Sequence, residues 1–391
     1  MSDTNRVALR FRKEATATPG TIATGAYAPL AYTGTSDLGA TPETVVSDII
    51  RSDRQVSDLI KTNESIGGSF DTELAPEAFN DLLLGTLQAT AWSTPAQTNI
   101  ATSGTTAFTT TQITNSSMTT TNVDIGDFVR VKKALVTKFY RVTAKTSTSL
   151  TVQGTPNASF ANGSGFTITH GVKANNNKVF SSFTFEREYT DHASPTFEYL
   201  SGLAVDSFSV SASASSIVTA SFGLVGMGHT SGTARTGGVS TGSDVPFAPF
   251  NASNNVATIG ESGTPGLQVC TEVTMEVSNN LRERNVVGSE GASSIGSGEF
   301  NVTGQLSVYF EDNTLLNKLL TNEETSLSFG FANPDGSALL FDMPAIKFSE
   351  GVPEISGKNE DVMLNLGYQA IRKSGVTTGD GYTLQITRFT A

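Results

Sequence analysis

The feature that most constrains this chain is a strand-and-helix pattern that occurs twice. Residues 68–84 read GSFDTELAPEAFNDLLL, and residues 304–320, which begin 236 positions later, read GQLSVYFEDNTLLNKLL. In each copy, alternating side chains indicate a strand, and a leucine-rich stretch after an acidic turn indicates a short helix with an apolar face. Each copy therefore predicts a sheet strand followed by a helix that lies against the flank of a β-structure.

Other segments match at a shorter spacing. Residues 182–186 (SFTFE) correspond to residues 326–330 (SLSFG), and residues 218–224 correspond to residues 362–368, both 144 positions apart. Matches on both sides of a change in spacing indicate that a whole unit is duplicated. The difference between the two spacings, about 92 residues, is the length of an insertion in the first copy.

The duplication and the insertion predict the domain organisation. We assign residues 1–92 and 178–228 to a first domain, residues 93–177 to a small, outward-facing inserted domain, residues 229–245 to a linker, and residues 246–391 to a second domain. The insertion contains four short strand-like runs, and the chain is rich in Ser, Thr and Gly with only 16% charged residues. The predicted fold is mainly β: two tandem β-sandwich or β-barrel domains, each with a flanking α-helix, and the small all-β insertion.

Charge and residue types narrow the function. The formal net charge is −12 and no basic cluster is present, which disfavours tight binding to nucleic acid. His170, His192 and His229 are far apart, the single Cys270 cannot supply a metal cluster, and no nucleophile motif accompanies the neighbours Asp191 and His192. We therefore expect no catalytic residue, no metal and no cofactor. No signal-peptide pattern and no apolar run of about 20 residues is present, so we expect a protein made in the cytoplasm without a membrane segment.

Two long charged segments precede the repeated strands. Residues 48–65 separate two strand-like runs, and residues 279–298 hold the corresponding place in the second half. Long loops in a compact domain are often functional, and a solvated loop is the alternative. The candidate contact residues are Arg51, Asp53, Arg54, Gln55, Asp58, Arg282, Glu283 and Arg284. Near the N-terminus, residues 6–13 carry the cations Arg6, Arg10, Arg12 and Lys13 and fit either an edge strand or an arm.

Several of these segments resemble one known family. Residues 49–58 (IIRSDRQVSD), 67–74 (GGSFDTEL) and 79–83 (FNDLL) are similar to the N-terminal signature of tail tube proteins from long, non-contractile-tailed phages. Residues 126–131 (GDFVRV) and 140–144 (YRVTA) are similar to a segment seen within that family. The resemblance spans close to the whole chain, and no family member offers a catalytic residue to transfer.

The resemblance implies a structural protein of the virion. It implies two packed antiparallel sheets with a flanking helix, inner sheets that join across subunits around a channel, and a long loop and N-terminal arm that bridge adjacent rings. Because each chain would supply two domains, we expect three copies to form a ring with pseudo-sixfold symmetry. The implied partners are other copies of the chain and the tail terminator, tape measure and distal tail proteins. The resemblance also implies that the tail is assembled in the host cytoplasm and that the protein contacts no membrane.

The repeated strands are the candidate wall of that channel. The predicted wall residues are Phe70, Thr72, Leu74, Leu306, Val308 and Phe310. Asp71 and Glu73 alternate with them and are candidate acidic residues of the lumen, where they would repel double-stranded DNA that passes through without tight binding.

A binding protein is the competing interpretation. A virion or cell-surface adhesin could use the insertion to bind a carbohydrate or a receptor. The aromatic residues are 23 Phe against 8 Tyr and 1 Trp. Phe lacks the polar tip of Tyr and Trp and suits dry contacts, which disfavours a sugar-binding platform.

Overall fold

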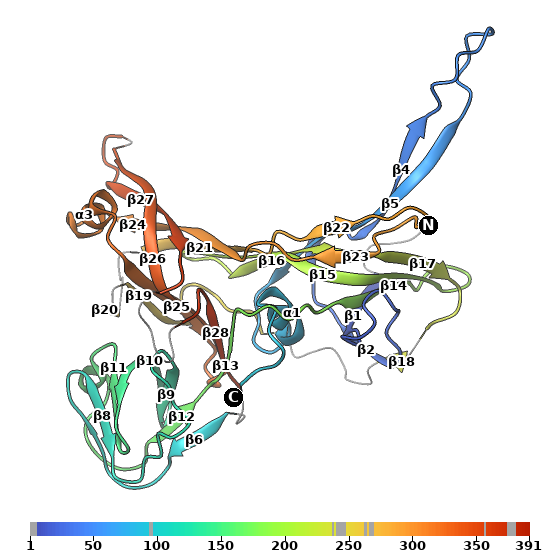
Figure 1. Cartoon of the computed structure of the whole chain (residues 1–391). Helices are drawn as coiled ribbons and strands as arrows, with labels where there is room; N and C mark the ends of the chain where they lie inside the picture. Colours follow the sequence, from blue (N-terminus) through green and yellow to red (C-terminus); the bar gives the residue numbers. More distant parts are fainter. Residues whose placement is uncertain are drawn as a thin grey trace.

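The computed structural model describes residues 6–93, 97–236, 238–239, 248–261, 264–265, 270–355, 357–373 and 381–391. The fold is mainly β, as the sequence predicts (Figure 1). The described part contains three short helices: α1 (Asn80–Thr86), α2 (Pro156–Ser159) and α3 (Thr314–Thr321). The strands form two open layers in each half rather than a closed barrel.

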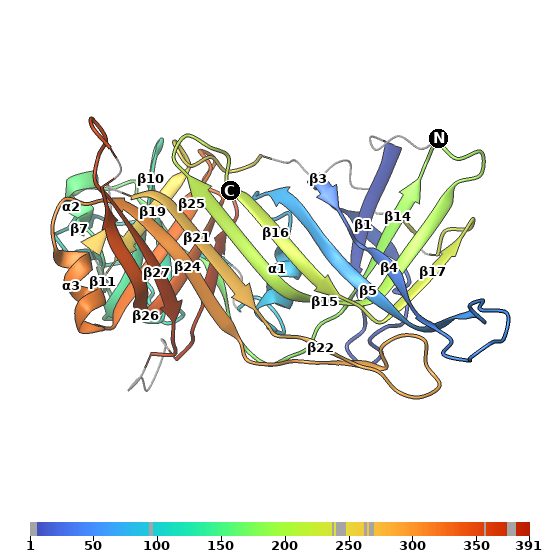
Figure 2. The same cartoon turned by 90° about the horizontal axis from the view of Figure 1, so that it is seen from above.

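One layer is a continuous antiparallel sheet that runs through both halves (Figure 2). Its strands, in spatial order, are β3 (Thr33–Ser36) and β4 (Gly39–Val46) at one edge, β5 (Leu59–Glu73), β16 (Thr219–Val225), the C-terminal part of β15 (Thr196–Ser213), β21 (Cys270–Ser278), β24 (Asn301–Tyr309), β27 (Met363–Ala370) and the C-terminal part of β26 (Ala338–Glu354). We call this layer the long sheet. One of its faces is concave and free, and the other covers the core.

The second layer lies beneath the long sheet and is split between the two halves. In the first half, the N-terminal part of β15 pairs with β14 (Phe183–Tyr189) and β17 (Gly228–Gly232), and β14 continues to β1 (Val7–Lys13), β2 (Ala26–Pro29) and β18 (Gly238–Val239). In the second half, the N-terminal part of β26 pairs with β25 (Thr325–Ala332) and β28 (Gln385–Phe389), followed by β19 (Val256–Glu261) and β20 (Thr264–Pro265), while β13 (Val172–Asn175) pairs with β28. Thus β15 and β26 each belong to both layers.

The order of pairing shows the duplication directly. The first half has β4–β5–β16–β15 in the long sheet and β1–β14–β15–β17 beneath it, and the second half has β21–β24–β27–β26 and β19–β25–β26–β28. The strands that match in sequence, such as β5 with β24 and β14 with β25, hold the same places. Since the pattern recurs without exception in these strands, the sequence repeat is a structural repeat.

The insertion forms a separate seven-stranded sheet with its own apolar core. Its order is β6 (Thr98–Ala101), β12 (Thr167–His170), β9 (Phe128–Lys133), β10 (Val136–Lys145), β11 (Ser149–Val152), β8 (Gln112–Asn115) and β7 (Thr106–Phe108). The four runs recognised in the sequence became β9 to β12. The other three strands are short and Thr-rich, so their periodicity carries no clear strand signal.

The insertion is fastened to the second half, although it interrupts the first. Arg141 of β10 makes a buried bidentate ion pair with Asp342 of β26, with N–O distances of 2.8 and 3.0 Å. Phe139 packs edge-to-face on Phe389 with ring centroids 5.2 Å apart. The insertion lies against the second half on the side of the molecule away from the concave face (Figure 1).

Part of the segment expected to be a linker is instead a strand. Residues 228–232 form β17, which pairs with residues 197–201 of β15. The expectation was wrong for these residues because an edge strand can be held by backbone hydrogen bonds while its side chains stay exposed and polar. Residue 237 and residues 240–245 of the expected linker lie outside the described residues.

Candidate functional site

Four of the predicted wall residues lie in β5 and β24 of the long sheet, and Leu74 and Phe310 directly follow these strands; all six face the core rather than the free face. Phe70, Leu74, Leu306 and Val308 are buried in the core, and Phe310 is partly buried against it. Phe70 stacks on Phe222 of β16 with ring centroids 5.2 Å apart.

Thr72 is buried too, and its hydroxyl donates to the Ala31 carbonyl at 3.1 Å. The wall strands therefore supply the core side of the long sheet, and their alternate residues supply the free side.

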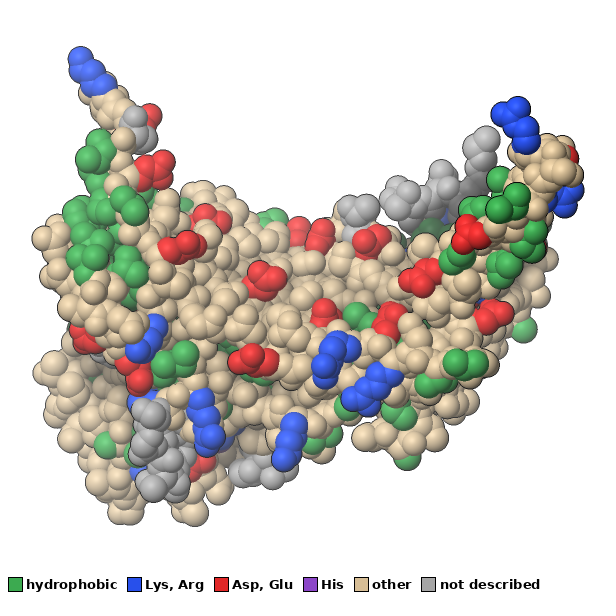
Figure 3. Space-filling view, turned by 45° about the horizontal axis from the view of Figure 1, so that its top comes forward, with side chains coloured by type: hydrophobic (Ala, Val, Ile, Leu, Met, Phe, Trp, Pro, Cys, Tyr) green, Lys and Arg blue, Asp and Glu red, His purple; other side chains and the backbone are tan. Residues whose placement is uncertain are grey.

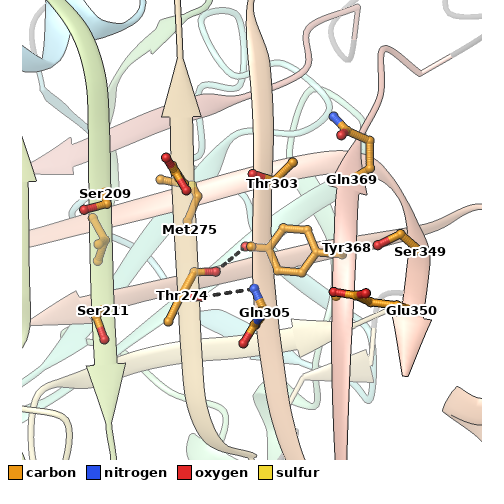
Figure 4. A pocket seen from close by; sticks show the side chains of 14 residues that line it. Ser209, Ser211, Thr274, Met275, Thr303, Gln305, Ser349, Glu350, Tyr368 and Gln369 are labelled. Carbon is orange, nitrogen blue, oxygen red and sulfur yellow. Dashed lines mark hydrogen bonds between the residues drawn. The ribbon is translucent and has the colours of Figure 1, made fainter. Parts of the chain in front are cut away.

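The free, concave face is polar. Two shallow hollows occur on it, one of about 480 Å³ over β15, β21, β24, β27 and β26 (Figure 4) and one of about 380 Å³ over β3, β5, β15 and β16. Apart from Tyr368, Val210, Met275 and Ala220, their side chains are mostly Ser, Thr, Gln, Asp and Glu. Neither Lys nor Arg is among the described residues that line the two hollows.

Acidic side chains are spread along this face (Figure 3). Asp71 lines the smaller hollow, and Glu276 and Glu350 line the larger one. Glu73, the second acid predicted for the lumen, lies at the end of β5 opposite Thr219 and lines neither hollow. Sequence reasoning missed Glu276 and Glu350. Glu276 did carry a signal, because it alternates with the buried Met275 and Val277 in β21. Glu350 carried none, because the register of β26 shifts between Phe348 and Glu350.

Gly304, the first residue of the repeated motif, has a packing role in the larger hollow. A Cβ atom there would lie 2.1 Å from the Thr274 carbonyl oxygen and 2.4 Å from the Tyr368 hydroxyl oxygen. The Tyr368 hydroxyl crosses this space and donates to the Thr274 carbonyl at 2.7 Å (Figure 4). Burial raises the pKa of Tyr368 above its ordinary value, so the phenol keeps its proton. A larger residue at position 304 would displace the Tyr368 hydroxyl and break this hydrogen bond, which links β27 to β21 across β24.

The long sheet has two open edges, one at each end of the chain's body. In the described structure, β4 pairs only with β5, and residues 350–354 of β26 pair only with β27. The halves meet differently, because the C-terminal part of β15 pairs along its length with β21, from Ser207 opposite Ser278 to Ser213 opposite Glu272. β4 is the counterpart of β21, and β26 is the counterpart of β15. The chain thus carries one completed junction and the two unpaired halves of another.

The first charged segment is the tip of a long hairpin. β4 and the start of β5 run away from the body, and residues 47–58 form the connection at their end (Figure 1). The predicted contact residues Arg51, Asp53, Arg54, Gln55 and Asp58 are all located on this tip. Arg51 and Asp53 form an exposed ion pair at 2.6 Å, and the hydrogen bond from Arg51 lowers the pKa of Asp53.

Apolar side chains on the hairpin were missed by the sequence reasoning. Ile49 and Val56 are exposed on the tip, and Ile50 is 98% exposed. Val45, Val46, Leu59 and Ile60 are also exposed on the stem. The only local sign of these exposed side chains was the pair Ile49–Ile50 next to charged residues. Apolar periodicity alone does not tell whether such a pair is exposed or belongs to the core.

The second charged segment takes a different course. Residues 282–284 form β22 (Arg282–Arg284), which pairs with β23 (Ser294–Gly296), and the connection between them reaches the hairpin stem. There the Glu64 amide donates to the Glu290 carbonyl at 2.6 Å, and Lys61 pairs with Glu290 at 3.0 Å. The predicted residues Arg282, Glu283 and Arg284 therefore lie in a short strand rather than at a projecting tip.

Three of the four N-terminal cations, Arg10, Arg12 and Lys13, lie in β1, so the segment forms a strand rather than a free arm. Arg10 pairs with Glu186 at 2.9 Å and with Glu188 at 2.7 Å, on the neighbouring strand β14. Arg12 donates to the Ala26 carbonyl at 2.7 Å. Arg6 precedes the strand and is exposed, and Lys13 ends it half-buried. The segment is therefore part of a sheet in this chain, and its Arg10 is already paired with carboxylates of β14.

A comparison with protein-family models decides the relationship. The model described as phage tail tube protein matches residues 4–370. The chain belongs to the phage tail tube protein family. No individual curated protein matches the sequence. A tail tube protein is a structural component of the virion that assembles with copies of itself and with other tail proteins, and the open edges and polar concave face are the features relevant to that role.

Two further findings concern chemistry and membranes. The described residues contain no group of three or more His, Cys, Asp or Glu side chains that could hold a metal ion. In the same part of the chain, no helix has both the length and the apolar character required to span a membrane.

Proposed function

We propose that three copies of this tail tube protein close into a ring and that the rings stack into the tube of a long, non-contractile tail. The observation that carries the proposal is the β15–β21 junction between the halves. β26 and β4 are the counterparts of these strands and are the unpaired edges of the long sheet. Pairing β26 of one copy with β4 of the next would repeat the internal junction and remove both exposed edges.

The internal junction also gives the register of the contact between copies. Ser207 of β15 lies opposite Ser278 of β21. Glu350 of β26 is equivalent to Ser207, because their strand partners, Gly367 and Gly223, are 144 positions apart. Thr41 of β4 is equivalent to Ser278, because their strand partners, Ser65 and Asn301, are 236 positions apart. Glu350 of one copy is therefore expected beside Thr41 of the next.

Cysteine pairs test this register with an internal control. The Ser207→Cys/Ser278→Cys variant should form a disulfide within one chain, because these residues are direct cross-strand partners. The Thr41→Cys/Glu350→Cys variant should instead link copies, giving covalent dimers and trimers on a non-reducing gel. A variant whose tubes form but never cross-link contradicts the register, and covalent species beyond three copies contradict the trimer.

The concave face would line the channel. Asp71, Glu276 and Glu350 place negative charge there, and neither Lys nor Arg is among the described residues that line its hollows. An acidic wall repels phosphates and lets DNA pass without binding. In phage carrying the Asp71→Lys/Glu276→Lys/Glu350→Lys variant, we expect tails of normal length but slower DNA ejection, measured by dye release from purified particles. Unchanged ejection contradicts a lumenal position for this face.

The hairpin is the better candidate for the contact between rings than β1. Its tip carries Ile49 and Ile50, both exposed, whereas Arg10 of β1 is already paired inside the chain. Tail terminator, tape measure and distal tail proteins would then meet the ends and the lumen of the tube, in a virion assembled in the host cytoplasm. The tube has no enzymatic role in this proposal.

Electron microscopy of the purified full chain tests the proposal as a whole. We expect tubes or rings whose averages show threefold symmetry with six similar lobes. Rings of six chains contradict the trimeric arrangement. A protein that stays monomeric at all concentrations contradicts the tube function itself.

A further inference from the structure

The two repeated helices have the same sequence pattern but very different surroundings. Leu84 ends the leucine run of α1, and Leu320 holds the same place in α3, 236 positions later. Leu84 is 4% exposed, whereas Leu320 is 74% exposed. Five residues of α1 are buried, and none of α3 is. Since the pattern is shared, the difference comes from position in the chain.

The helix α1 lies at the junction between the halves, and the second half helps to cover it (Figure 1). The Asn279 side chain, just after β21, donates to the Thr86 carbonyl at 3.0 Å. Gln88, directly after the helix, donates to the Ser297 hydroxyl at 3.0 Å. Arg388 of β28 lies over the Trp92 ring, 5.0 Å from its centroid.

The helix α3 keeps the contacts with its own half, and among the described residues its outer side is left exposed at Leu320. Leu319 lies against Gly351 of β26, and Lys318 pairs with Glu261 of β19 at 2.6 Å. α3 is at the end of the molecule, where exposed hydrophobic side chains gather beside the β26–β27 hairpin (Figure 3). Ile355, which directly follows β26, is among these exposed residues.

We propose that the outer face of α3, centred on Leu320, is covered by the first half of the adjacent copy in the ring. The inference rests on the proposed ring, because the copy that pairs with the open edge of β26 also arrives next to the helix that packs on β26. Within the chain, the second-half residue that binds α1 directly is Asn279, which follows β21. The counterpart of that position is Pro42 in β4, since Ser278 and Thr41 occupy equivalent places in the sheet. The root of the β4–β5 hairpin is therefore the covering element.

Thiol labelling tests whether Leu320 becomes covered. Leu320→Cys is compared with Leu135→Cys, whose leucine is 100% exposed in the turn between β9 and β10. Both are made with Cys270→Ala, although burial already raises the pKa of the Cys270 thiol to about 11 and makes it a poor nucleophile. On assembly, labelling of L320C by a maleimide should slow by at least about tenfold, as for a group that reacts only after local opening. Labelling of L135C should stay unchanged.

The outcomes separate this inference from the proposed function. If rings form and L320C reacts as fast as in the monomer, the helix is not covered, and the inference fails while the ring stands. If the chain remains monomeric, both fail. A second variant, Leu320→Asp, should reduce the yield of rings at least about tenfold at limiting concentration, whereas Leu135→Asp should leave it unchanged. Equal yields for the two aspartate variants also overturn the inference.

Discussion

The connection between β4 and β5 and its counterpart between β21 and β24 come from one repeated unit but end in different places. The first projects from the body with Ile49 and Ile50 exposed. The second lies back along the first half, where Glu290 binds the backbone of Glu64. The helices α1 and α3 differ in the same way. In both pairs, the copy next to the internal junction makes its contact within the chain, whereas the copy at an end of the chain's body stays exposed.

The largest effect expected concerns the two equivalent leucines. Leu84→Ala should lower the free energy of unfolding of the monomer by about 3 kcal/mol, because it leaves a cavity in a packed core. Leu320→Ala should change it by less than about 0.5 kcal/mol, because the side chain is exposed. Urea denaturation of both variants at a concentration that keeps the chain monomeric measures the difference. Similar losses would show that the two helices are not in different environments.

The next effect concerns stacking of rings through the hairpin. Ile50→Asp should weaken association between rings by about 2 kcal/mol, which is the burial free energy of such a side chain. Val287→Asp is the matched control, because Val287 is fully exposed on the β22–β23 connection. Tube length as a function of protein concentration, measured by electron microscopy, gives the comparison. If only Val287→Asp shortened the tubes, the β22–β23 connection and not the β4–β5 hairpin would make the contact between rings.

A smaller effect is expected in acid titration of the two segments. The hydrogen bond from Arg51 lowers the pKa of Asp53, so its stabilising contribution is present above the ordinary Asp pKa and is lost as pH falls through the lowered value. Burial, and then the nearby Glu43, raise the pKa of Glu283, so its unfavourable contribution grows as pH rises from the ordinary Glu pKa to the raised value.

Carboxyl NMR titration checks the two signs, with Asp53→Asn and Glu283→Gln to assign the resonances. Asp53 should titrate below the ordinary Asp value, and Glu283 above the ordinary Glu value. Shifts in the same direction would mean that the two segments do not differ as the structure shows.

The smallest effect concerns the ion pair at the hairpin stem. Lys61 bridges Glu64 and Glu290 on the surface, and exposed ion pairs contribute little. Lys61→Ala should therefore leave the β22–β23 connection in place, because the backbone hydrogen bond from Glu64 to Glu290 remains. Hydrogen exchange of the Glu64 amide, with and without the substitution, measures this. A large gain in exchange would show that the ion pair, and not the backbone, holds the connection.

The repeat could be predicted because its signals are local. The alternation around Phe70 and the leucines of α1 and α3 follow from neighbouring residues, and the matched copies strengthen each signal. β17 was missed because an edge strand of Gly, His, Thr and Ser carries no apolar pattern. The short strands before β9 were missed because each has only one or two apolar residues within a Thr/Ser-rich segment.

The site could be predicted only in part. The position of Asp71 on the free face follows from the alternation of β5, but the presence of Glu276 and Glu350 on the same face depends on how strands far along the chain are ordered in the sheet. The opposite courses of the two charged segments depend on what lies next to each, which no local pattern encodes. The attachment of the insertion to the second half rests on Arg141 and Asp342, which are 201 residues apart.

That attachment has a mechanical consequence. The insertion leaves and re-enters the chain beside α1, where the Asn177 amide binds the Leu87 carbonyl at 2.8 Å, and it grips the second half through the buried pair of Arg141 and Asp342. It therefore connects the junction between the halves to the second half, on the side opposite the concave face (Figure 1). In the proposed ring, the angle between the halves would determine how many copies close the circle, so the insertion would help to set the bore of the tube.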